Sequence, residues 1–138
     1  MRVDIAEISW QQTMALRHQV LWPDKPLVFC RVAEDEDGCH LGAFADDKLV
    51  CVASLFVKDN AMRLRKFATL PEYQGQGIGS SVLSEAILRA RNLGLASFWC
   101  DARQSASGLY RRFGLCQSGE PFYKGEIAYA RMALTLSP

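Results

Sequence analysis

Three glycines at alternating positions, Gly75, Gly77 and Gly79, lie between an extended segment and a strongly periodic one. Residues 62–69 alternate in the manner of a β-strand, and beyond Gly79 apolar residues recur at the three- and four-residue spacing of a helix. Without side chains, the backbone N–H groups of such a turn can converge at the helix start, where unpaired N–H groups and the helix dipole attract an anion. The segment 74–80 therefore predicts a strand–turn–helix unit that binds phosphate or pyrophosphate.

Two familiar nucleotide-binding loops do not fit this spacing. A Walker A loop needs a lysine after its last glycine, and none follows Gly79. A Rossmann fingerprint needs Gly-x-Gly-x-x-Gly and an acidic residue about 20 positions further on. The glycines here alternate strictly, and the corresponding region is the apolar run 96–100. The remaining alternative is a turn whose glycines only let the helix pack.

Cap and turn signals predict the N-terminal elements. Ser9 and Gln12 have the spacing of a capping box, which predicts a helix from Ser9 to about Leu21. This helix should end before Pro23, because the residue that precedes a proline avoids helical geometry. The acid-rich stretch 23–40 is either a solvated loop or part of a substrate site.

The remaining elements are predicted from periodicity. We expect strands at 41–45, 48–57, 62–69, 96–100, 116–123 and 128–136, a long helix from 78 to about 93, and a short helix at 105–113. The run 96–100 is almost wholly apolar, so we expect it to be buried on both faces. No repeat or linker interrupts this order, which predicts one α/β (α+β) domain over residues 1–138 with a mixed central sheet flanked by helices.

Composition argues against several classes of protein. Sixteen basic and 15 acidic residues leave a net charge of +1, which gives no electrostatic reason to expect nucleic acid or a membrane as a partner. No apolar run approaches the roughly 20 residues of a membrane-spanning helix. Acidic residues stand where a signal peptide would be apolar, so we expect a cytoplasmic protein. Five cysteines without a Cys-x-x-Cys pair, and only two histidines, predict reduced structural thiols and no metal site.

Two motifs make the chain resemble the GCN5-related N-acetyltransferase (GNAT) family. Residues 74–79, Gln-Gly-Gln-Gly-Ile-Gly, match the family signature Gln/Arg-x-x-Gly-x-Gly/Ala, and Leu-Pro-Glu-Tyr at 70–73 is similar to its usual lead-in. Residues 106–115, Ala-Ser-Gly-Leu-Tyr-Arg-Arg-Phe-Gly-Leu, resemble the family's Ala-x-x-x-Tyr-x-x-x-Gly-Phe element. The resemblance covers the chain from about Leu41 to its end, and it implies a GNAT-like sheet whose central strands splay apart.

The resemblance also implies a reaction and the residues that perform it. The donor would be acetyl-CoA, and a primary amine of a small molecule or protein would attack it directly in a ternary complex. The backbone of Phe67, Ala68 and Thr69 would bind the pantetheine arm, and the pyrophosphate would be held by Gln74, Gly75, Gln76, Gly77, Ile78, Gly79 and Ser80. Tyr110 falls where many members have the tyrosine that protonates the departing thiolate. An aromatic residue that only packs is the alternative role for Tyr110.

Two positions depart from the family pattern. Arg103 stands where many members have a cofactor-binding asparagine, so that role cannot be transferred. The strand 62–69 also lacks the glutamate that often serves as a base. A water relay remains, or one of the acids Glu34, Asp35, Glu36, Asp37, Glu72 and Asp101. The missing acid keeps alternatives open: an acyl-CoA-binding regulatory module with lapsed chemistry, or a different acyl donor.

The acceptor is the least constrained part of the prediction. Arg63, Arg65 and Lys66 would suit an amine that carries a carboxylate or phosphate, although a solvated strand face explains them equally well. Family analogy also assigns Tyr123, Glu126 and Tyr129 to the acceptor pocket. The sequence identifies neither the acceptor nor the oligomeric state, and a homodimer stays open.

Overall fold

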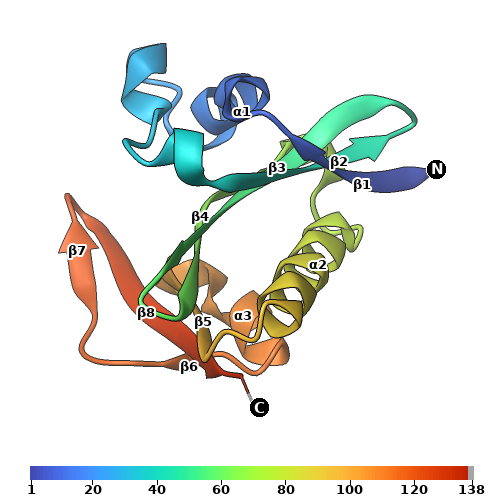
Figure 1. The fold of residues 1–138 in the computed structure, drawn as a ribbon. Coiled ribbons are helices and arrows are strands. Elements are labelled where there is room, and N and C mark those ends of the chain that lie inside the picture. The colour runs from blue at the N-terminus through green and yellow to red at the C-terminus, as the bar shows by residue number, and fades with distance from the viewer. Residues whose placement is uncertain (137–138) are drawn as a thin grey trace. The chain divides into compact units, whose positions relative to one another are not determined.

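The computed structural model describes residues 1–136, whose helices and strands are drawn in Figure 1. Over that range, eight strands form a mixed sheet in the order β1-β2-β3-β4-β5-β8-β6, with β7 paired to β8, and three α-helices accompany it. The predicted mixed α/β class is confirmed. Two compact units share the elements: unit 1 holds residues 1–56 and 65–85, and unit 2 holds 57–64 and 86–136. None of the helices in the described range is long and apolar enough to span a bilayer.

The strands of unit 1 form an antiparallel meander, seen side by side in Figure 1. Strand β1 (Val3–Ile8) pairs with β2 (Cys39–Ala45), which pairs with β3 (Lys48–Lys58). Asp46 and Asp47 connect β2 to β3 with φ values of 46° and 71°. Two consecutive left-handed residues are the geometry of a tight hairpin turn, so the predicted hairpin is confirmed.

Helix α1 (Trp10–Leu16) begins with the predicted capping box. The Gln12 N–H donates to Ser9 Oγ at 3.2 Å, and the Ser9 N–H donates to Gln12 Oε1 at 2.8 Å. The helix then continues as a π-helix over Arg17–Leu21 instead of staying α-helical to its end. The segment predicted to be irregular contains two short 3₁₀ helices, at Leu27–Cys30 and Asp35–Asp37.

Strand β4 (Ala61–Thr69) and helix α2 (Ile78–Asn92) flank the glycine-rich turn, after a 3₁₀ helix at Pro71–Tyr73. Burial alternates along the first half of β4, and Lys66, within the strand, has a φ of 53°. The predicted apolar face of α2 is buried at Ile78, Val82, Leu83, Ala86, Ile87 and Ala90. Leu93 does not extend this face, because the helix ends before it and its side chain is 63% exposed.

In unit 2, strand β5 (Ser97–Arg103) pairs in parallel with β4 over residues 61–64 and antiparallel with β8 (Ile127–Thr135). The prediction that this strand is buried on both faces is wrong. Burial alternates strictly: Phe98, Cys100 and Ala102 are buried, whereas Trp99 and the other odd positions are partly exposed. The strand runs three residues beyond the predicted end, and its last residues complete the alternation of a sheet with one open face.

The remaining elements of unit 2 are short. Helix α3 (Ser107–Arg112) follows a 3₁₀ turn at Gln104–Ala106, close to the predicted helix. The strand predicted at 116–123 is instead two strands, β6 (Cys116–Gln117) and β7 (Phe122–Lys124), which both pair with β8. Gly119, with a φ of 83°, and Pro121 prevent a continuous strand between them.

Candidate active site

The glycine-rich segment of unit 1 forms a turn that is open at Gly75 and Gly77. These residues have φ values of 75° and 83°, in the left-handed region that favours glycine. A Cβ atom on either would meet nothing within 4 Å, so backbone conformation, and not crowding, requires glycine there. At Gly79 a Cβ would lie 3.4 Å from Phe67 Cζ and 3.7 Å from Thr69 Oγ1. The turn therefore packs on β4 at Gly79 and leaves its first two glycines open.

Two glutamine side chains hold the turn against the preceding residues. Gln74 Nε2 donates to the carbonyl oxygen of Thr69 at 3.0 Å, and Gln76 Nε2 donates to that of Glu72 at 3.1 Å. Each amide thus uses one of its two N–H donors within the protein.

The first turn of α2 supplies such N–H groups. The first helical hydrogen bond joins the Ser81 N–H to the Gly77 carbonyl at 3.1 Å. The N–H groups of Ile78, Gly79 and Ser80 precede that bond, so the helix offers them no carbonyl partner. Together with the positive end of the helix dipole, they suit a negatively charged group. Such a turn suits a phosphate or pyrophosphate, and the binding role of residues 74–80 stays a prediction.

The residues predicted to bind the cofactor all belong to unit 1, where contacts at Gly79 and Gln74 join the turn to the end of β4. Beside them, Thr69 Oγ1 donates to Cys51 Sγ at 3.3 Å. Burial raises the pKa of the Cys51 thiol to about 11, although this hydrogen bond opposes the shift. Cys51 therefore stays a neutral packing group, which supports the prediction of a structural thiol.

Tyr110 belongs to unit 2, on the buried side of α3, with 7% of its surface exposed. Its side chain is hydrogen-bonded to the thiol of Cys100 on β5. Burial and the charge of Asp101 raise the pKa of Cys100 to about 12, against smaller lowering effects of Tyr110 and Arg63. The tyrosine is therefore held by a neutral thiol. Its role toward a departing thiolate stays a prediction.

A charged cluster occupies the open face of unit 2, on β4, β5 and β8. Asp101 Oδ1 accepts from Arg131 Nε at 2.9 Å, and its Oδ2 accepts from Nη2 of Arg131 and Nη2 of Arg63, both at 3.3 Å. The two guanidinium carbons lie 4.1 Å (Arg131) and 4.6 Å (Arg63) from the centre of the Trp99 ring. Such cation–π contacts contribute about 0.5–1 kcal/mol each at exposed sites. We call Arg63, Trp99, Asp101 and Arg131 the Arg–Trp–Arg cluster.

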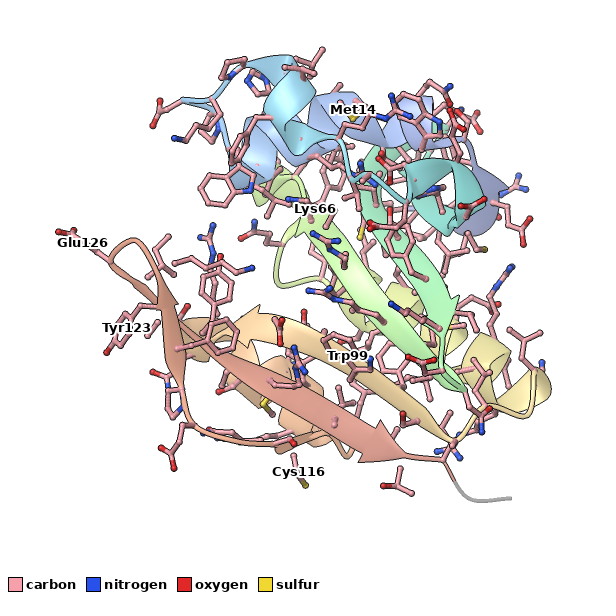
Figure 2. The ribbon with its side chains drawn as sticks, turned by 60° about the vertical axis from the view of Figure 1, so that its left-hand side comes forward. Met14, Lys66, Trp99, Cys116, Tyr123 and Glu126 are labelled. Carbon is pink, nitrogen blue, oxygen red and sulfur yellow. The ribbon has the colours of Figure 1, made fainter. Side chains whose placement is uncertain are left out.

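The residues predicted to line the acceptor pocket do not share one environment. Tyr123 and Glu126 lie exposed in the β7–β8 hairpin, where Figure 2 labels them. Tyr129 is instead buried, and its ring stacks on Phe122 with centroids 5.9 Å apart. Of the three basic residues predicted on β4, only Arg63 belongs to the Arg–Trp–Arg cluster. Arg65 pairs with Glu34 at 3.6 Å, and Lys66 lies 6.0 Å from the Trp22 ring centre.

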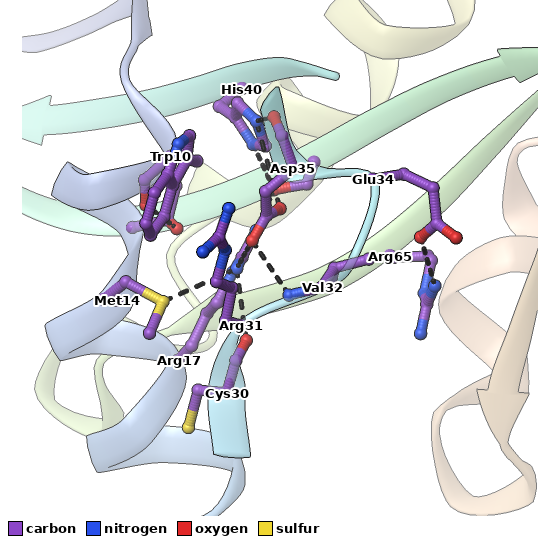
Figure 3. Close-up of polar contacts among 12 residues, drawn as sticks. Trp10, Met14, Arg17, Cys30, Arg31, Val32, Glu34, Asp35, His40 and Arg65 are labelled. Atoms are coloured by element: carbon purple, nitrogen blue, oxygen red, sulfur yellow. Dashed lines mark hydrogen bonds and ion pairs between the residues drawn. The ribbon is translucent and has the colours of Figure 1, made fainter. Parts of the chain in front are cut away.

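A buried ion pair in unit 1 was not predicted from the sequence (Figure 3). The side chains of Arg17 and Asp35 are fully buried and joined by two hydrogen bonds of 2.8 and 2.9 Å. Asp35 also accepts from the Val32 N–H at 2.9 Å, and Arg17 donates to Ser54 Oγ at 2.8 Å. His40 Nε2 donates to the Asp35 carbonyl at 2.8 Å. Eighteen residues separate the two charges, and no local pattern connects them.

The charge of Asp35 is stabilised by its neighbours. Burial alone would raise the pKa of its carboxyl group. The hydrogen bonds from Arg17 and Val32, with the charges of Arg17 and His40, outweigh burial and lower the pKa below its ordinary value of 3.8. Asp35 therefore does not belong to a solvated loop. Nor can it act as a general base, because its oxygens are occupied by donors.

Other acids considered as bases are also engaged. Glu34 pairs with Arg65, and Glu36 pairs with Arg31 at 3.3 Å. Asp101 is held by two guanidinium groups, which suits it to positioning them. Asp37 and Glu72 are instead exposed. A base at either of them, or a water relay, stays a prediction.

Comparison with known proteins bears on this site. The acetyltransferase (GNAT) domain family matches residues 25–136. A Bacillus subtilis (strain 168) protein described as the uncharacterized N-acetyltransferase YitI is 34% identical over 129 aligned residues, and the match covers 87% of this chain and 87% of that protein. The chain belongs to the GNAT acetyltransferase family. The predicted family and the predicted class of enzyme, an acyltransferase, are thereby confirmed.

Solved structures agree with this GNAT fold. The ribosomal-protein-S18-alanine N-acetyltransferase of Escherichia coli superposes with a TM-score of 0.81 at 19% identity, over 99% of this chain and 96% of that one. A GNAT acetyltransferase from Elizabethkingia anophelis, solved with acetyl-CoA bound, has a TM-score of 0.76 at 18% identity, over 97% and 98% of the two chains. At these identities the likeness establishes the fold.

Proposed function

We propose that this GNAT protein transfers an acetyl group from acetyl-CoA to a primary amine of a small molecule or a protein. The observation that carries the proposal is the turn of unit 1. Gly75 and Gly77 are left-handed and open, and the free N–H groups of α2 follow them directly. This arrangement suits the pyrophosphate of coenzyme A, with the backbone of 67–69 beside the pantetheine arm. The Elizabethkingia anophelis relative was solved with that donor bound.

The proposed chemistry assigns one residue to proton transfer. The neutral amine attacks the thioester carbon, so that a C–N bond forms and the C–S bond breaks, with its electron pair on sulfur. Tyr110 gives its phenolic proton to that sulfur, and solvent replaces the proton. The amine loses its extra proton to water. We propose further that both units act as one N-acetyltransferase domain over residues 1–138, in the cytoplasm and without a metal.

The coenzyme A site is tested with two glycine variants. Gly77→Glu places a carboxylate on the open turn, whereas Gly94→Glu makes the same change at another left-handed glycine, with a φ of 72° and nothing within 4 Å of its Cβ. Backbone strain should therefore be similar in the two variants. At about 100 times its Kd, coenzyme A should add about 2.7 kcal/mol of stability to wild type and to Gly94→Glu.

Thermal unfolding with and without coenzyme A measures this effect. We expect coenzyme A to raise the Tm of wild type and of Gly94→Glu, and to leave the Tm of Gly77→Glu unchanged. An equal rise in both variants would exclude the turn as the pyrophosphate site.

The catalytic role of Tyr110 is tested by Tyr110→Phe, which removes only the hydroxyl group. We expect kcat to fall by about 10²-fold or more, since positioned proton donors contribute that much. The Tm shift with coenzyme A should persist. Release of free thiol from acetyl-CoA across a panel of amines measures the rates, and equal rates for wild type and Tyr110→Phe across the pH range would contradict the assignment.

The same measurements separate the alternative functions. A regulatory module with lapsed chemistry would bind coenzyme A at the turn and release no thiol with any amine. A different acyl donor would be revealed by turnover of longer acyl-CoA thioesters and not of acetyl-CoA.

A further inference from the structure

The proposed reaction assigns no role to the Arg–Trp–Arg cluster. Asp101 lies at the centre of the cluster, with 10% of its side chain exposed, and both of its oxygens accept hydrogen bonds from guanidinium groups. Its charge is therefore directed at the two arginines and away from solvent. Register places Arg63 opposite Trp99 on β5, and Arg131 opposite Asp101. All four side chains consequently share one face of the sheet, the face opposite buried Cys100.

The four side chains of the cluster sum to one positive charge. Two guanidinium groups stand against a single carboxylate, which leaves a net charge of +1. Register places two further cationic side chains on this face: Arg103 opposite Tyr129, and Lys124 with its amine 4.6 Å from the Tyr129 ring centre. A monoanion fits this balance, whereas a phosphate monoester would bring a second negative charge close to Asp101.

Arg131 retains donors for such an anion. Its hydrogen bonds to Asp101 use Nε and Nη2, and among the described residues no partner engages Nη1. The Arg131 side chain as a whole is 48% exposed. Contact with Trp99 and the two bonds to Asp101 hold the guanidinium in place, which reduces the entropy lost when a ligand binds.

We propose that the Arg–Trp–Arg cluster binds the carboxylate of the acceptor, so that the amine substrates of this enzyme are amino acids or similar amino carboxylates. The proposal rests on the proposed acetyltransferase function. It assigns Arg131 the carboxylate contact, Arg63 the supporting charge, and Asp101 and Trp99 the positioning of both guanidiniums. The stacked rings of Phe122 and Tyr129 continue the same face and offer apolar surface to the rest of the acceptor.

Product-like carboxylates test the proposal without requiring turnover. The full chain, labelled with ¹⁵N, is titrated with N-acetylglycine, N-acetyl-L-methionine and N-acetyl-L-phenylalanine, and with the carboxamide of each. The arginine Nε–Hε resonances are followed by NMR. We expect at least one acid to cause saturable shifts of the Arg131 resonance. Its carboxamide should bind about tenfold more weakly or worse, because a charge-assisted hydrogen bond is lost.

Three variants define the site. Arg131→Gln should weaken binding of the acid about tenfold and leave the carboxamide unaffected. Arg131→Lys, which keeps the charge and loses the two-point bond to Asp101, should fall between Arg131→Gln and wild type. Arg111→Gln makes the same charge change at an exposed position on α3 and should bind like wild type. The proposal is overturned if no acid saturates, if acid and carboxamide bind alike, or if Arg131→Gln binds as tightly as Arg111→Gln.

A coenzyme A titration of the same samples separates the two proposals. Coenzyme A binding without carboxylate binding would overturn the acceptor site and leave the acetyltransferase function intact. Carboxylate binding without a coenzyme A response would overturn the acetyltransferase function and leave only a carboxylate-binding site.

Discussion

At the scale of single residues, the strongest constraint is the buried pair of Arg17 and Asp35. Each charge is removed from water, and each is stabilised only because the other and a few hydrogen bonds replace the solvent. The pair joins the π-helix that follows α1 to the segment before β2. It thereby holds in place part of the stretch 23–40, which its acidic composition alone would suggest is a solvated loop.

We predict that Asp35→Asn lowers the free energy of unfolding by about 3–5 kcal/mol at neutral pH. The variant leaves the Arg17 charge buried without its counter-charge. It also directs an amide N–H₂ group toward donors on Arg17 or Val32. Urea unfolding measures the loss, and Asp37→Asn, at an exposed position of the same 3₁₀ helix, should change stability little. Equal losses in the two variants would contradict the buried-pair interpretation.

The pH dependence of this effect has a definite sign. The folded pKa of Asp35 is lowered relative to the unfolded chain, so the carboxylate contributes stability above its ordinary value of 3.8. That contribution is lost as the pH falls through the lower folded pKa. The stability difference between wild type and Asp35→Asn should therefore be constant from pH 5 to 7 and shrink below about pH 4.

At the scale of elements, sequence signals between neighbouring residues were sufficient to predict most helices, strands and turns of the fold. The capping box at Ser9 and the aspartate turn at 46–47 depend on neighbouring residues, and both formed as predicted. The apolar face of α2 and the glycine-rich turn before it are likewise local. The elements on which the proposed coenzyme A site depends were therefore accessible from the sequence.

Elements whose burial depends on pairing with distant strands were predicted less well. The apolar run 96–100 predicts a strand that ends at Cys100 and is buried on both faces. With residues 101–103 included, the strand alternates, and its open face carries the Arg–Trp–Arg cluster. The contact of Trp99 with Arg131 depends on strand pairing across more than 30 residues, for which the sequence contains no local signal.

At the scale of the whole molecule, the five cysteines differ sharply in environment. Cys30, Cys51 and Cys100 are at most 2% exposed, Cys39 is intermediate and Cys116 is exposed. We predict that a chromogenic disulfide reagent at pH 8 modifies Cys116 first and Cys39 more slowly. The buried three should react only in denaturant, because the reagent cannot reach them in the folded protein. For Cys51 and Cys100 a raised pKa, about 11 and about 12, slows the reaction further.

Cys116→Ser provides the control for this measurement. It should remove the fast phase of the folded protein and lower the total in denaturant from five thiols to four. More than two thiols reacting promptly in the folded protein would contradict the burial of the others.

The pairing of Arg17 with Asp35 also bears on how this chain can evolve. Loss of either member alone leaves one charge buried without compensation, and a protein of ordinary stability has only about 5–15 kcal/mol in total. A lineage that replaces the pair by apolar residues must therefore pass through a weakened ancestor or change both codons almost together. We therefore expect the two positions, 18 residues apart, to change together or not at all.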